Sequence, residues 1–81
     1  MEPATLAALL TAPAAGPALQ WAHASADTRA PVLALLDGPA VEHRCFAVLA
    51  RAMGDIENAL AHDGKAMAHE AAAAVLRGGG R

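Results

Sequence analysis

A stripe of large apolar side chains between residues 41 and 60 constrains the fold of this chain more than any other feature. The side chains recur at intervals of three or four residues, which is the spacing of one face of an α-helix. The stripe consists of Val41, Cys45, Val48, Leu49, Met53, Ile56 and Leu60. A helix with such a stripe needs a second surface to pack against, so the sequence predicts a helical hairpin or bundle.

Length and composition predict a thin hydrophobic core. The chain has 81 residues, enough for one domain, and 56% of them are hydrophobic. Alanine supplies much of that fraction, and burying an alanine methyl gains little beside the roughly 1.5 to 3 kcal/mol of a leucine, valine or phenylalanine. The chain has one Trp, one Phe and no Tyr. We therefore expect that association with another chain would help it to stay folded.

Proline and glycine predict where the helices begin and end. Asp37-Gly38-Pro39 and Asp63-Gly64 resemble helix boundaries, whereas Gly54 lies within a strongly periodic segment. No segment alternates with period two, so we expect no strand. The prediction is one all-α domain over residues 1–77, a small hairpin or bundle of three to four helices, followed by a disordered Gly-rich tail at 78–81. The expected helices span 3–11, 17–36 with a kink or restart at Pro31, 39–62 as the longest, and 65–77.

A row of small residues lies beside the apolar stripe, at Ala47, Ala50, Gly54 and Ala61. Such a row lets a second helix approach closely, which would favour a tight antiparallel hairpin with residues 17–36. The alternative is that the row only reflects the high alanine content.

The charge of the chain disfavours one class of partner, and its cysteine content indicates a cellular compartment. Six basic and eight acidic residues give a formal net charge of -2, without a basic block, so a nucleic-acid partner is disfavoured. The single Cys45 cannot form an intramolecular disulfide, and we expect it to be a small buried hydrophobe. With no signal-peptide pattern, a reducing cytoplasm fits best. No uncharged run is long enough for a membrane span.

No arrangement of side chains in the sequence predicts a reaction. The four histidines, His23, His43, His62 and His69, match no metal-ligand spacing, and His43 and Cys45 are two residues apart, on different sides of a helix. Ser25 has no base at a helical contact spacing. We therefore expect no metal, no cofactor, no small-molecule substrate and no enzymatic activity.

The order of the predicted elements resembles one family. The predicted second helix ends at Leu35-Leu36-Asp37-Gly38. It is followed by Ala40-Val41-Glu42-His43, by Phe46 with residues 49–53, and by Ile56-Glu57-Asn58-Ala59-Leu60. Over residues 19–60 this order is similar to the small needle co-chaperones of bacterial type III secretion systems. Those proteins are helical hairpins that pair with a repeat-containing chaperone, and the pair holds the needle subunit unpolymerised in the cytoplasm.

The resemblance implies a set of partner contacts. Carried over by position, they are Leu33, Leu36, Phe46, Leu49, Met53 and Ile56. This chain departs from the family in its high alanine content and in the additional helix expected at 65–77. The function predicted is a non-enzymatic interaction module, an adaptor or co-chaperone for a helical protein. A self-associating helical bundle is the alternative, and a dimeric DNA-binding regulator is the third candidate.

Overall fold

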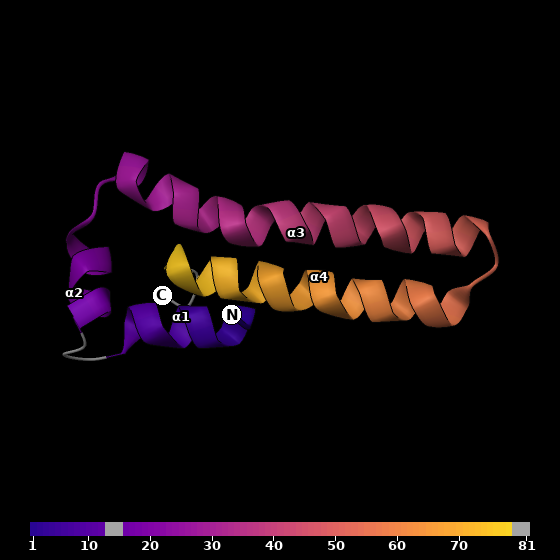
Figure 1. Ribbon diagram of the computed structural model, residues 1–81, viewed down its shortest axis with the longest axis horizontal. Helices are drawn as coiled ribbons and strands as arrows, with labels where there is room; N and C mark the ends of the chain where they lie inside the picture. Colours follow the sequence, from indigo (N-terminus) through magenta and orange to yellow (C-terminus); the bar gives the residue numbers. More distant parts are fainter. Residues whose placement is uncertain (13–15, 79–81) are drawn as a thin grey trace.

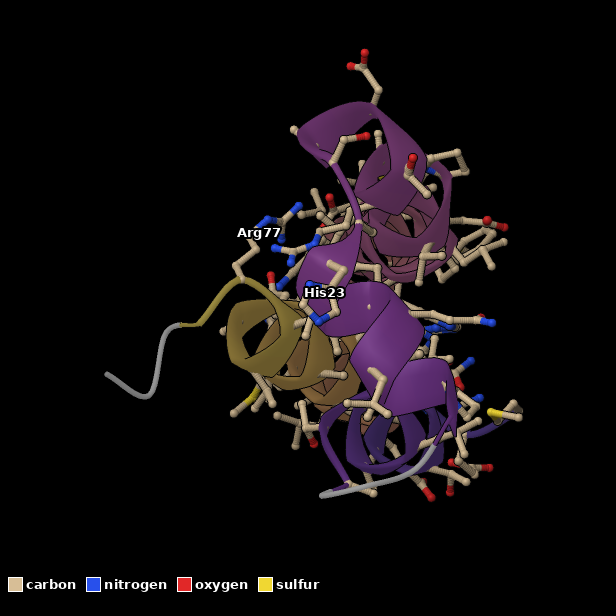
Figure 2. All side chains as sticks on the ribbon, turned by 90° about the vertical axis from the view of Figure 1, so that its left-hand side faces the viewer. His23 and Arg77 are labelled. Carbon is tan, nitrogen blue, oxygen red and sulfur yellow. The ribbon has the colours of Figure 1, made fainter. Side chains whose placement is uncertain are left out.

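Four α-helices form the computed structural model, which describes residues 1–12 and 16–78 (Figure 1). They are α1 (Pro3–Thr11), α2 (Gly16–His23), α3 (Ala26–Ala52) and α4 (Ile56–Leu76). The long helices α3 and α4 form an antiparallel hairpin, and α1 lies along the C-terminal half of α4. Helix α2 lies across the open end of the hairpin, away from the turn that joins α3 to α4 (Figure 2). The described residues contain no strand, so the predicted all-α class is confirmed.

Side-chain caps and proline explain where most helices begin. Pro3 occupies the first turn of α1, where its missing amide hydrogen costs nothing. The Ser25 hydroxyl accepts a hydrogen bond from the Thr28 amide at 3.2 Å and caps α3. The Asp55 carboxylate accepts one from the Asn58 amide, also at 3.2 Å, and caps α4.

The hairpin turns at Gly54, and the predicted longest helix over 39–62 is therefore wrong. Gly54 has a φ of 78°, in the left-handed region that glycine adopts most readily. Asp37-Gly38-Pro39 and Asp63-Gly64, predicted as boundaries, lie inside α3 and α4. A helical glycine costs about 1 kcal/mol relative to alanine, and an interior proline about 3 kcal/mol. The packing of α3 along α4 outweighs these local costs.

The predicted helix over 17–36 is divided in the structure. Helix α2 ends at His23 and α3 begins at Ala26, with Ser25 as its cap. Pro31 lies inside α3 and does not start a new helix. The expected Gly-rich tail follows α4, but only Gly78 of it belongs to the described residues.

The large buried side chains lie at one end of the molecule. Leu36 of α3 and Leu76 of α4 are buried together with three alanines, Ala7, Ala72 and Ala73. Partly buried side chains from α1, α2 and α3 pack against this cluster: Leu6, Leu10, Trp21, Val32 and Leu33. The core therefore lies where α1 and α2 meet the hairpin. We call the other end, residues 40–52 of α3 and 56–69 of α4, the turn-proximal half.

Candidate protein-binding surface

Small residues at seven-residue intervals form the contact between α3 and α4. Ala40 and Ala47 face the partner helix from α3, and each is at most 5% exposed. The corresponding row on α4 is Ala59, Ala66 and Ala73, at 0 to 1% exposed. A seven-residue repeat of alanine lets two helices approach closely along their whole contact. We call this contact the seam.

The predicted small-residue row only partly coincides with the seam. Ala47 and Ala50 are buried in it, but Gly54 forms the turn and Ala61 is exposed. The helix that packs on the row is α4, so the predicted hairpin with residues 17–36 is wrong. The difference follows from the position of the turn, because folding at Gly54 brings the next helix along the chain onto α3.

A row of ion pairs on one flank of the seam specifies how the two helices align. The guanidinium of Arg44 binds Asp63 at 3.1 Å and Glu70 at 2.6 Å. Arg51 also binds Asp63, and Arg77 binds Asp37. Each step of seven residues along α3 is matched by a step of seven residues back along α4. The charges are therefore complementary in the observed antiparallel register, whereas a shift by two turns would place Asp37 opposite Glu70 in one direction, or Arg44 opposite Arg77 in the other.

These ion pairs also lower the pKa of two carboxyl groups. The hydrogen bond from Arg51 is the largest cause of the lowered pKa of Asp63, and Arg44 adds to it. The hydrogen bond from Arg77 lowers the pKa of Asp37 in the same way. Both carboxylates are thus held in the charged form that the alignment requires.

Three histidines meet on the other flank, in the turn-proximal half. The Nδ1 atoms of His43 and His62 lie 2.9 Å apart, at hydrogen-bond distance. The ring of His43 is 5.2 Å from that of His62 and 5.8 Å from that of His69, between centroids. Phe46 lies against His62, again at 5.2 Å. We call His43, His62 and His69 the histidine cluster.

Sequence reasoning missed the histidine cluster. It compared spacings within one helix, whereas the cluster joins two antiparallel helices. The seven-residue spacing of His62 and His69 was the available signal, because it places both rings on one face of the helix. His23 lies apart from the cluster, on α2 at the opposite end of the hairpin (Figure 2).

The apolar stripe that dominates the sequence lies on the outside of the hairpin. Leu49 is 58% exposed, Met53 is 83% exposed, and the other members of the stripe are exposed as well. Cys45 is also exposed, so the expectation that it is buried is wrong. The seam is filled by alanine and histidine, and α1 and α2 cover only the far end of the hairpin. Nothing within the described residues therefore covers the stripe.

The six predicted partner contacts fall into two groups. Leu36 is 3% exposed and Leu33 packs on the core, so these two side chains stabilise the chain's own fold. Phe46, Leu49, Met53 and Ile56 are all exposed in the turn-proximal half or in the turn itself. The structure thus buries Leu36, leaves Leu33 partly accessible, and exposes the whole of the second group.

An open groove runs along the outer side of α3. It has a volume of about 680 Å³, and its apolar lining comes mainly from Val41, Cys45, Val48 and Leu49. One edge of the groove is charged, because it is lined by members of the ion pairs described above: Asp37, Arg44 and Glu70. The groove therefore combines an apolar surface with a polar edge, the combination typical of a protein-binding surface.

The described part of the chain offers neither a metal site nor a membrane-spanning helix. Over residues 1–12 and 16–78, no three histidine, cysteine or acidic side chains are grouped so that they could hold a metal ion. No helix there is both long enough and apolar enough to cross a membrane. In comparisons with known proteins, neither a family model, nor a curated protein, nor a solved structure matches this chain.

Proposed function

We propose that this protein is a non-enzymatic docking module whose turn-proximal half binds a helix of another protein. The observation that carries the proposal is the exposure of large apolar side chains over that half of the hairpin. They are Val41, Phe46, Val48, Leu49, Met53, Ile56, Leu60 and Met67. Val41, Val48 and Leu49 line one groove, and an exposed apolar surface of this kind on a small protein is typical of a site that binds another protein.

The shape of this surface favours a helical partner. Val41, Cys45 and Val48 are spaced four and three residues apart along α3, the interval at which two helices interlock. They line an open apolar groove, the kind of surface into which an amphipathic helix docks. Arg44 and Glu70 at its edge provide polar groups that can orient such a helix.

The specific form of the proposal is a co-chaperone of the type III secretion kind. A helical hairpin with an uncovered apolar face is the architecture that the resemblance implies, and the partner would then be a repeat-containing chaperone. Co-expression with a helical-repeat chaperone and a needle subunit, where neighbouring genes encode them, tests this form directly. A stable ternary complex supports it, and failure of the chain to join the other two proteins contradicts it.

A pair of matched variants tests the docking surface itself. Leu49→Asp places a charge on the exposed surface, whereas Glu57→Ala removes a side chain from the first turn of α4. A tagged chain is used to capture partners from the native cell, and the captured protein is then purified and titrated. We expect Leu49→Asp to weaken binding by more than tenfold and Glu57→Ala to leave it unchanged. Equal binding by the two variants contradicts the proposed surface.

Self-association is a second candidate, favoured by the outer face of α3. Six small or β-branched side chains recur there every three or four residues without a charge, and all are exposed. They are Ala34, Gly38, Val41, Cys45, Val48 and Ala52. Two copies could bury the same stripe across a twofold axis. Light scattering after size exclusion distinguishes the candidates, since a dimer at micromolar concentration favours self-association and a monomer favours a separate partner.

A further inference from the structure

The seam of the turn-proximal half is built almost entirely from alanine and histidine. Ala40, Ala47 and Ala50 of α3 face Ala59 and Ala66 of α4, and the histidine cluster fills the space beside them. The buried leucines lie only at the other end, where α1 and α2 complete the core. Because alanine burial contributes little, this half depends on the contacts beside the alanines, which are the imidazole rings on one flank and the ion pairs of Arg44 and Arg51 on the other.

The contact between His43 and His62 limits how many protons the pair can hold. At 2.9 Å, the Nδ1–H of one ring donates to the unprotonated Nδ1 of the other. The accepting ring must therefore be neutral. If both rings were charged, both Nδ1 atoms would carry a hydrogen, so the hydrogen bond would be lost and two positive charges would face each other.

The charges around the pair do not relieve this constraint. Lys65 and His69 on α4 act on His43 in the same direction as His62, against its charged form, and only Glu42 on α3 favours that form. The α4 carboxylates Asp63 and Glu70 are bound by Arg44 and Arg51 on the other flank. Helix α1, which packs on α4, has no charged side chain between Pro3 and Thr11.

We propose that the histidine cluster makes the turn-proximal half of the hairpin sensitive to pH, so that it opens on mild acidification while the end held by α1 and α2 stays packed. The inference rests on the arrangement of His43, His62 and His69 and is independent of the proposed docking function. Opening would separate the two helices beside the turn and change the surface that this half presents.

The sign of the effect follows from the pKa of His43. Burial lowers this pKa below 6.5, its ordinary value, and the neighbouring positive groups lower it further. As the pH falls below 6.5, the open state takes up a proton before the packed state does, so the packed state loses stability until its own pKa is passed. The Asp37 and Asp63 carboxyls have pKa values lowered from 3.8, so they titrate at a separate, more acidic pH.

Urea unfolding and hydrogen exchange of the full chain at pH 7.5 and 5.5 test the proposal. We expect the urea midpoint to fall at pH 5.5. Protection from exchange, corrected for the intrinsic effect of pH, should be lost in residues 40–69 before it is lost in α1. His43→Leu removes the titrating group and keeps a side chain of similar size, so it should abolish most of the fall. His23→Gln, at the exposed His23, should keep the full fall.

A titration of the wild-type chain by NMR keeps the proposal testable if His43→Leu does not fold. The imidazole signals of His43 should titrate below pH 6.5, together with chemical-shift changes of backbone amides in the turn-proximal half. The proposal is overturned if the urea midpoint of the wild type is the same at both pH values. It is also overturned if a folded His43→Leu variant retains the fall.

Discussion

Replacing Ala66 by leucine tests the close approach of α3 and α4. Ala66 lies in the middle of the seam with none of its surface exposed, so three added carbon atoms have no free space to enter. Overpacking a well-filled contact in this way costs about 1 to 3 kcal/mol. Leucine and alanine are both good helix formers, so the change acts on the packing between helices rather than on the helix itself.

The magnitude is large enough to measure in a chain of this length. A loss of 1 kcal/mol corresponds to about 4 to 8 °C in Tm for a domain of this size. We therefore expect the Tm of Ala66→Leu to fall by at least about 4 °C in thermal unfolding followed by circular dichroism. Ala68→Leu is the matched control, because Ala68 lies on the same helix but is exposed. Its effect should stay within about 0.5 kcal/mol. A variant at Ala66 as stable as the control would refute the close-packed seam.

Three further predictions follow from the turn, the ion pairs and the carboxylates. Gly54→Ala should cost about 1 kcal/mol in chemical unfolding because of its positive φ, whereas Gly64→Ala, inside α4 with open space around it, should gain about 0.5 to 1 kcal/mol. Arg44→Glu should lower the Tm, and combining it with Glu70→Arg should restore part of the loss at low salt. Below pH 3.8 the wild type should lose stability as Asp63 is protonated, and Asp63→Asn should show less of this loss.

The fold class and the first helix could be predicted from local sequence patterns. Pro3 marked the start of α1, and the absence of period-two alternation established the all-α class. The position of the hairpin turn could not be predicted, because Gly38-Pro39 and Asp63-Gly64 have stronger local breaking signals than Gly54. What decides the turn is long-range. Only a bend at Gly54 aligns the alanine rows and the charges of both helices.

The candidate site could be predicted only in part, because it too depends on how the two long helices pack together. The apolar stripe was evident, but its orientation was not, since a helix can bury either a row of large residues or a row of small ones. The seam selects the alanine row, which leaves Leu49 and Met53 exposed and buries Leu36 under α1 and α2. The histidine cluster depends on the register between two helices, which no single-helix spacing reveals.

All of these proposals require that α3 folds back along α4. The most direct test measures the distance between spin labels placed at two exposed positions, Val41→Cys and Ala74→Cys, with Cys45→Ser to remove the native thiol. In the hairpin the labels stand on neighbouring helices whose axes are about 8 to 10 Å apart. An unbroken helix between the same positions would separate them by about 50 Å. A single short distance is the predicted result, and a distance near the longer value would contradict the hairpin.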